Sequence, residues 1–278
     1  MRTRQRLVRL FVGLTAAAML TTTAGWAFSA PASSPSKDGS IRLAAMRVPT
    51  SASPQPDRAG TVFERAKAQP REAREPRPRR HLLAAIERSM AITARPGEGR
   101  TIGEMPAGSR YYGTQHRAWI LDRTANGRFG KVAVPYSGSR ATGWIRIAGL
   151  DLSRTAYSVH ADLSRHLITV KRLGETIMRM PAATGAAGSP TPPGRYFVTD
   201  LVPIPGGGSF GTYAFGLSGI QPNLPAGWTG GDQMAIHGTN DPGSIGTSAS
   251  AGCLRVSERA LDRLKPVLRL GTPVTIQP

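Results

Sequence analysis

Apolar and polar residues alternate in short runs between residue 154 and the C-terminus, a pattern typical of half-buried β-strands. Turns rich in Gly, Pro and Ser separate the runs, which predict strands at 157–162, 167–170, 176–178, 195–198 and 274–276. One helix is expected near the end, because Ser257 can cap a segment with three apolar residues on one face. These residues are Ala260, Leu261 and Leu264. The pattern predicts a mainly β domain over 154–278 with one short helix.

A second β pattern covers residues 92–153. Its strand candidates are 119–121, 129–134 and 144–147, and Asn126-Gly127 is a strong hairpin signal. Several short strands in so small a region suit a small β-barrel of the SH3 type. The one histidine of this region, His116, has no obvious catalytic partner in the sequence. We therefore interpret the region as a packing or ligand-positioning module.

The first 91 residues show no comparable pattern. Residues 1–32 have a basic start followed by a mostly apolar run, which predicts a signal peptide or an uncleaved signal anchor. Residues 33–91 are rich in Pro, Ser, Ala and Arg and contain few aromatic residues, so they are expected to form a disordered linker. Within this linker, 82–90 is the one segment that favours a short helix.

The formal charge of +19 is concentrated near the N-terminus. Residues 1–100 carry 18 Lys and Arg against 7 Asp and Glu, which is +11, and the remaining residues carry +8. The second part lacks the dense basic face with interleaved aromatic residues that nucleic-acid binders present. We expect no nucleic-acid partner, and attraction to an anionic cell-wall polymer or membrane surface explains the charge better.

The chain has a single cysteine, Cys253. An exported chain with one cysteine forms no internal disulfide, so the thiol is an intermolecular link, a reactive group or a small buried hydrophobe. His237 precedes it by sixteen residues, in the segment IHGTNDPGSIGTSASAGCLR. The small residues between them let the backbone turn back, and an imidazole is the usual base for a thiol nucleophile. This segment indicates cysteine-dependent acyl transfer.

Several separated blocks over residues 155–278 resemble the L,D-transpeptidase catalytic domain of the YkuD type. They are the opening TAYSVHADLSRHLITV, Ala183-Thr184-Gly185, SPTPPGRYFV, AIHGTNDPGSIG, SAGCLRV and GTPVTI. The run Thr142-Gly143-Trp144-Ile145 is similar to SH3-like modules of wall-associated proteins. The expected fold is thus a β-sandwich catalytic domain with a short helix, preceded by a small SH3-like β-barrel and a disordered tether. In this family the position of Ala251 is often histidine. The alanine of this chain cannot make the side-chain hydrogen bond that such a histidine could form near the site.

The resemblance implies that Cys253 is the nucleophile and His237 the general base. A backbone carbonyl near Gly238 is expected to orient the imidazole, and a thiolate–imidazolium pair is expected to lower the pKa of the thiol. The amides of Ala251, Gly252 and Cys253 are candidate donors to the oxyanion of a tetrahedral intermediate.

Other polar residues near the thiol are candidate substrate contacts. Arg255 lies two residues past the thiol, at a position that belongs to the family motif. It is a candidate to bind a substrate carboxylate or to brace the catalytic loop, and the alternative is a surface ion pair. Ser250 and Thr239 are candidates for substrate binding or for plain turn chemistry. Asp241 is interpreted as a turn residue. No metal site is expected, because only His237 and Cys253 converge.

Two strand histidines, His160 and His166, are interpreted as structural. The glycine-rich segment 205–212 is a candidate lid.

These features predict an exported peptidoglycan L,D-transpeptidase that acts on stem peptides and needs no cofactor. The expected location is the cell wall, the periplasm or the outside of the cell. Two alternatives stay open at this point: an L,D-carboxypeptidase or other peptidoglycan-trimming hydrolase that uses the same thioester, and a non-catalytic wall-binding protein.

Overall fold

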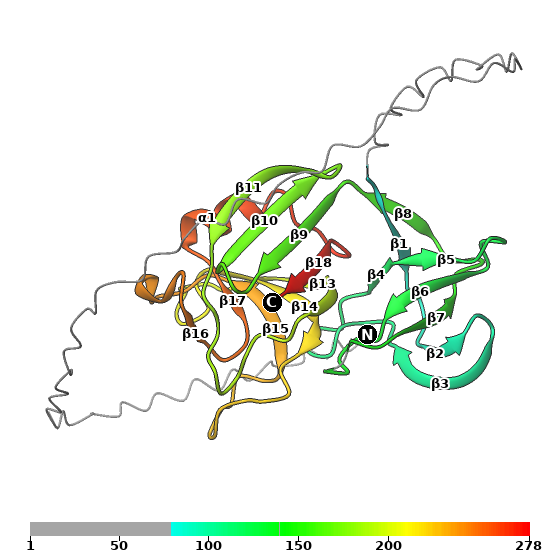
Figure 1. Ribbon diagram of the computed structural model, residues 1–278, viewed down its shortest axis with the longest axis horizontal. Helices are drawn as coiled ribbons and strands as arrows, with labels where there is room; N and C mark the ends of the chain where they lie inside the picture. Colours follow the sequence, from blue (N-terminus) through cyan, green and yellow to red (C-terminus); the bar gives the residue numbers. More distant parts are fainter. Residues whose placement is uncertain (1–78, 139) are drawn as a thin grey trace, which may run out of the picture. The chain divides into compact units, whose positions relative to one another are not determined.

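A computed structural model describes residues 79–138 and 140–278, which fall within a single structural unit. The predicted signal segment and most of the predicted linker lie outside these residues. The fold is mainly β, with two regions that each contain a core (Figure 1). The single α-helix of the described residues is α1, Glu258–Leu264, and Ser257 caps it by accepting a hydrogen bond from the Ala260 N–H. Ala260, Leu261 and Leu264 are buried on one face, as the sequence predicts.

The N-terminal module, residues 79–155, contains two antiparallel sheets. A three-stranded sheet has the order β4-β1-β8 and a five-stranded sheet the order β3-β2-β7-β6-β5. Their bounds are β1 His81–Ala85, β2 Met90–Arg95, β3 Glu98–Met105, β4 Arg117–Ile120, β5 Asp122–Arg123, β6 Phe129–Ala133, β7 Thr142–Arg146 and β8 Leu152–Thr155. The hairpin predicted at Asn126-Gly127 joins β5 to β6, and Gly127 has a positive φ of 68°.

The prediction for residues 79–91 was wrong. The expected helix over 82–90 is instead strand β1, which pairs with β4 on one side and β8 on the other. Ile86 after this strand is fully buried, so the folded region begins well before residue 92. Partners far along the chain supply the burial that this short apolar segment lacks on its own, and they override its helical propensity.

The C-terminal domain is built on an eight-stranded mixed sheet, in the order β11-β10-β9-β18-β13-β14-β15-β17. The bounds are β9 Tyr157–Asp162, β10 Leu167–Arg172, β11 Glu175–Pro181, β12 Thr184–Gly185, β13 Gly194–Pro203, β14 Tyr213–Ile220, β15 Gln233–His237, η1 Pro242–Ser244, β16 Ser248–Ser250, β17 Leu254–Arg255 and β18 Pro273–Gln277. All five predicted strands of this domain are present.

Strand β13 divides this sheet into two parts. Its residues 194–197 pair with β18, and residues 198–203 pair with β14. Apolar side chains from both parts meet in one core with those of α1, which gives the sandwich-like arrangement expected from the sequence. The core includes Val159, Ile168, Phe215, Ile236 and Leu254, all fully buried.

The two regions are joined through Phe197 of β13, which packs in the core of the N-terminal module. Its ring meets the edge of the buried His116 ring, with 5.5 Å between centroids. His116 does have partners: Nδ1 lies 2.9 Å from Pro106 O, and Nε2 lies 3.1 Å from the Tyr136 hydroxyl. Burial lowers the pKa of His116, so the structure supports a packing role for this histidine.

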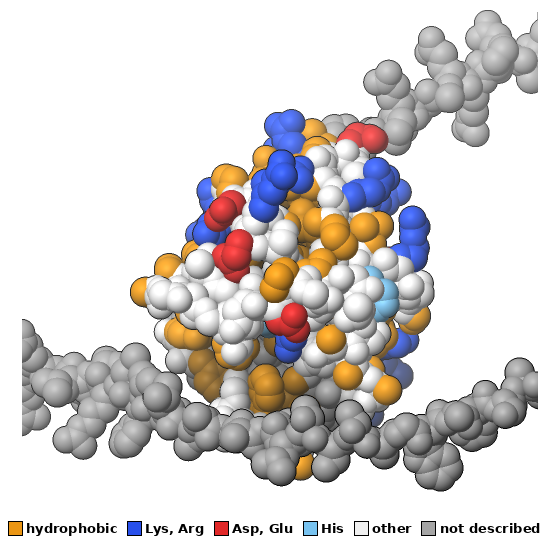
Figure 2. All heavy atoms as spheres, turned by 90° about the vertical axis from the view of Figure 1, so that its left-hand side faces the viewer, with side chains coloured by type: hydrophobic (Ala, Val, Ile, Leu, Met, Phe, Trp, Pro, Cys, Tyr) orange, Lys and Arg blue, Asp and Glu red, His pale blue; other side chains and the backbone are white. Residues whose placement is uncertain are grey.

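On the face shown in Figure 2, Lys and Arg side chains stand mainly near the upper edge, with acidic and apolar side chains between them. Among the described residues, no helix has the length and apolar character needed to cross a membrane.

Candidate active site

The proposed base, His237, is the last residue of strand β15, and the proposed nucleophile, Cys253, directly precedes the neighbouring parallel strand β17. In the pairing of β15 with β17, Ile236 is opposite Leu254 and His237 is opposite Arg255. Ile236 and Leu254 are fully buried in the core. Since side chains alternate along a strand, His237, Arg255 and Cys253 are directed to the other face. There they line one cavity of about 370 Å³.

Aromatic residues from two loops form other walls of this cavity. Phe210, from the glycine-rich segment 205–212, lies against His237 with 5.0 Å between ring centroids. Trp228 contributes a second ring, held by a hydrogen bond of 2.7 Å from its Nε1–H to Gly231 O. Sequence reasoning missed both residues as site residues, and a lone Phe within the glycine-rich segment was the one available signal.

The His237 ring is fixed by the carbonyl that follows it. Nδ1 lies 2.6 Å from Gly238 O, and the side chain is buried. A carbonyl oxygen only accepts hydrogen bonds, so Nδ1 carries the proton and Nε2 of the neutral ring is unprotonated. The orienting carbonyl expected near Gly238 is thus that of Gly238, and Nε2 is the nitrogen available to act as a base.

The environment of His237 keeps its ring neutral. Burial lowers the pKa to about 4, an effect larger than that of the Gly238 and Phe210 carbonyls, which favour the charged ring. The Arg255 guanidinium lowers the pKa further, and Glu258 opposes it.

Cys253 is held as a neutral thiol. Its Sγ–H donates to Gln233 O at 4.0 Å, and burial raises its pKa, with partial compensation from the Ala235 backbone and Arg255. Within the described part of the chain, no hydrogen bond joins Sγ to His237. Desolvation thus disfavours both charges of the expected thiolate–imidazolium pair, which stays a prediction. Gln233, which no motif indicated, is a site residue that sequence reasoning missed.

Ser250 stabilises the loop that carries the thiol. Its Oγ–H donates to Cys253 O at 2.6 Å, and its oxygen accepts from the Gly252 N–H at 3.1 Å. The hydroxyl is thereby used within the loop, while Ser250 also lines the cavity of the thiol, so its assignment to substrate binding stays a prediction. The Gly252 N–H is occupied too, which corrects its assignment as an oxyanion donor. Across residues 79–138 and 140–278, the N–H groups of Ala251 and Cys253 have no partner, so these two remain the candidate donors.

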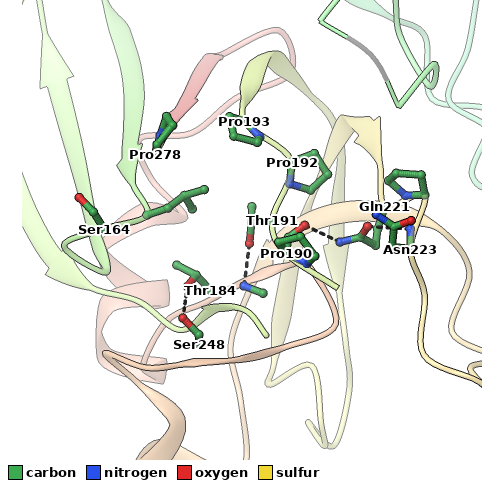
Figure 3. A pocket seen from close by; sticks show the side chains of 13 residues that line it. Ser164, Thr184, Pro190, Thr191, Pro192, Pro193, Gln221, Asn223, Ser248 and Pro278 are labelled. Atoms are coloured by element: carbon green, nitrogen blue, oxygen red, sulfur yellow. Dashed lines mark hydrogen bonds between the residues drawn. The ribbon is translucent and has the colours of Figure 1, made fainter. Parts of the chain in front are cut away.

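Gly252 is a position where only glycine fits. Its φ is 114°, and a Cβ there would collide with the side-chain amide of Gln221. Gln221 is anchored in turn by donating from Nε2 to Pro190 O at 2.8 Å (Figure 3). The cavity of about 500 Å³ drawn there also contains Ser248 of β16, so the SPTPPG segment lies beside the strand that leads into the loop.

Arg255 lines the same cavity as the thiol. Its backbone is fixed by a pair of hydrogen bonds with Ala183. The Nε atom is buried and has no hydrogen-bond partner among the described residues. No ion pair of Arg255 occurs in this part of the chain either, which disfavours the surface ion pair that was the alternative.

The remaining polar candidates are structural. Thr239 Oγ1 accepts from the Asp241 N–H at 3.0 Å and does not line the cavity, which corrects its assignment to substrate binding. Asp241 lies in that turn, as expected. His166 Nδ1 lies 3.1 Å from Thr184 Oγ1, and His160 is half-buried in β9, both outside the cavity. No group of three or more metal-ligating side chains occurs within the described ranges.

Comparison with known proteins covers the part of the chain that carries this cavity. Residues 156–276 match the YkuD family model, the L,D-transpeptidase catalytic domain. Both His237 and Cys253 fall within the matched range. This agrees with the resemblance seen in the sequence blocks, while the SH3-like assignment of the preceding module stays a prediction.

Two curated relatives match the same region. The YkuD proteins of Bacillus licheniformis and Bacillus subtilis, for which L,D-transpeptidase is a provisional name, are each 30% identical to this chain. The matches cover 44% and 43% of this chain and 66% and 65% of those proteins, so the chain spans just under two thirds of their length. Among solved structures, an L,D-transpeptidase from Mycobacterium smegmatis is 16% identical, with a TM-score of 0.36 over 70% of this chain and 99% of that one.

Proposed function

We propose that the protein is a peptidoglycan L,D-transpeptidase that cross-links stem peptides through a thioester on Cys253. The observation that carries the proposal is the shared cavity of Cys253, His237 and Arg255, within residues that match the L,D-transpeptidase catalytic domain. A thiol, an imidazole with an unprotonated Nε2 and a guanidinium provide a nucleophile, a base and an anion-binding group.

In the first half-reaction, Cys253 Sγ attacks the carbonyl carbon of the third residue of a donor tetrapeptide stem. Rotation about the Cα–Cβ bond takes the thiol away from Gln233 O, and its proton passes to Nε2 of His237. The Ala251 and Cys253 N–H groups face the oxyanion. The C–N bond then breaks, and the terminal D-alanine leaves with the proton from the imidazolium. Because neither charge is stable in the resting site, proton transfer accompanies the attack rather than preceding it.

In the second half-reaction, the side-chain amine of an acceptor stem attacks the thioester. His237 takes a proton from the amine, the C–S bond breaks, and the proton returns to sulfur. The products are a new amide cross-link and the free thiol. No cofactor takes part in either step. The apolar rings of Phe210 and Trp228 beside the thioester limit the access of water, which favours the amine over hydrolysis.

The substrate contacts follow from the same cavity. Arg255 is the group suited to bind a carboxylate of the stem peptide, because its buried Nε has no protein partner. Phe210 and Trp228 offer apolar surface to the stem backbone. We further propose that the protein is exported and meets this substrate at the cell wall, where its basic surface favours anionic wall polymers.

Incubation of the full chain with tetrapeptide muropeptides, followed by mass spectrometry, tests this function. Cross-linked dimers and free D-alanine are expected. Tripeptide monomers and D-alanine without dimers would contradict transfer and assign the protein as a carboxypeptidase. Unchanged muropeptides, with Cys253 inert to a carbapenem, would instead support a non-catalytic wall-binding protein.

A further inference from the structure

A chain of buried and half-buried hydrogen bonds connects the N-terminal module to the proposed nucleophile. It begins at Ser109, which lies between β3 and β4 and is almost fully buried. The Ser109 oxygen accepts from the Thr114 N–H at 3.2 Å, so its own proton is free for another acceptor. That acceptor is Asp200 Oδ1 of β13, at 2.5 Å.

Asp200 has no exposed surface and receives hydrogen bonds from neutral groups only. Besides Ser109, the Thr199 hydroxyl donates to Oδ2 at 2.8 Å and Gln233 Nε2 at 3.1 Å. None of the ion pairs of the described residues includes this carboxyl group. A buried carboxylate without a cation is costly, and here three donors satisfy it, one of which comes from the other module.

Gln233 links this cluster to the active site. Its side-chain amide is fixed by contacts with Asp200, with Thr199 Oγ1 at 2.9 Å and with Leu217 O at 3.1 Å. Its own backbone oxygen accepts the Cys253 thiol. Gln233 is also the first residue of the strand that ends at His237, so its position influences both catalytic side chains.

The packing around the cluster leaves little room for movement. A Cβ at Gly216, on the neighbouring strand β14, would lie 2.8 Å from Asp200 Oδ2 and 2.9 Å from Gln233 Nε2. A displacement of Asp200 is therefore transmitted to Gln233 rather than absorbed.

We infer that Ser109 and Asp200 are positioning residues that hold the Cys253 thiol through Gln233. The N-terminal module is then a part of the catalytic unit, and not only a neighbour that packs against it. The role of these residues in catalysis rests on the proposed function. Their effect on the hydrogen bond of the resting thiol does not depend on it.

The test uses the full chain, which has one cysteine and therefore one S–H stretching band. S109A leaves Asp200 short of a donor, so it is expected to shift the infrared band towards that of an unbonded thiol. It is also expected to raise the rate of Cys253 alkylation by iodoacetamide severalfold, while kcat for dimer formation falls at nearly constant KM. S109T keeps the hydroxyl and is expected to retain the wild-type band. S89A removes a hydroxyl that bonds Ala107 N in the same module, outside the chain of bonds, and is expected to change neither readout.

A folded S109A protein with the wild-type band and alkylation rate would overturn the inference. If S109A does not fold, T199V takes its place, because it removes another donor to the same carboxylate. An unchanged S–H band in a folded T199V protein would also overturn the inference. Neither the infrared band nor the alkylation rate requires a substrate. A shifted band in a protein that forms no dimers would therefore uphold the positioning network and refute the proposed function.

Discussion

The carbonyl oxygen of Gly238 lies 2.6 Å from Nδ1 of His237, and this contact decides which ring nitrogen can act as a base. A side chain that lacks a basic nitrogen at the Nε2 position should be unable to take the thiol proton. For His237→Gln we expect Cys253 acylation by a carbapenem to slow by about 10²–10⁴-fold, measured by intact-protein mass spectrometry. His160→Gln, on strand β9 outside the cavity, is the matched control and should acylate at the wild-type rate.

The pKa of about 4 for His237 predicts how stability depends on pH. The unfolded chain binds the proton near its ordinary pKa of about 6.5, whereas the folded protein does not bind it until about 4. The stabilisation is therefore complete above pH 6.5 and is lost as the pH falls to 4. It amounts to at most about 3 kcal/mol in the free energy of unfolding.

Urea unfolding at intervals between pH 7 and pH 4 measures this dependence. In His237→Gln the dependence should be weaker, though not absent, because burial also lowers the pKa of His116. Equal slopes in the two proteins would show that the ring titrates normally in the folded state.

The charge of Arg255 is expected to support thiol ionisation. The guanidinium lowers the pKa of Cys253 against the larger, opposing effect of burial. Arg255→Gln should therefore raise that pKa further and slow iodoacetamide alkylation at pH 8, whereas Arg255→Lys should retain most of the rate. Faster alkylation in Arg255→Gln would mean that the side chain acts by shielding the thiol and not by its charge.

Substitution of two glycines in the catalytic segment distinguishes the cost of backbone strain from the cost of a steric collision. Gly246 has a φ of 88° with open space around its Cβ position, while Gly252 has a φ of 114° and Gln221 against it. We expect Gly246→Ala to cost about 1–2 kcal/mol of unfolding free energy, from strain alone. Gly252→Ala should cost several kcal/mol and abolish acylation.

Denaturant unfolding of both variants gives these values. Similar losses in the two proteins would indicate that Gln221 moves aside and that the tight packing behind the loop is unimportant.

Periodicity and spacing predicted the parts of this protein that depend on neighbouring residues. The strands of the C-terminal domain, the helix capped by Ser257 and the placement of His237 and Cys253 in one cavity all follow local patterns. The carbonyl near Gly238 could be predicted for the same reason, because it belongs to the residue next to the base.

Long-range partners decide the features that could not be predicted. Strand β1 looks helical on its own, and only pairing with β4 and β8 makes it a strand. Ser109 and Asp200 are 91 residues apart, and no motif marks either one. Burial of Cys253, which raises its pKa against the expectation, depends on walls contributed by three separate loops.

Isolation of the acyl-enzyme tests the central claim most directly. The full chain would be incubated with a tetrapeptide donor without acceptor, quenched in acid and analysed by intact mass and peptide mapping. We predict a tripeptide adduct on Cys253 and an equal amount of released D-alanine, with neither in Cys253→Ala. Release of D-alanine by the Cys253→Ala protein would contradict the account, because the chain has no second thiol to carry the acyl group.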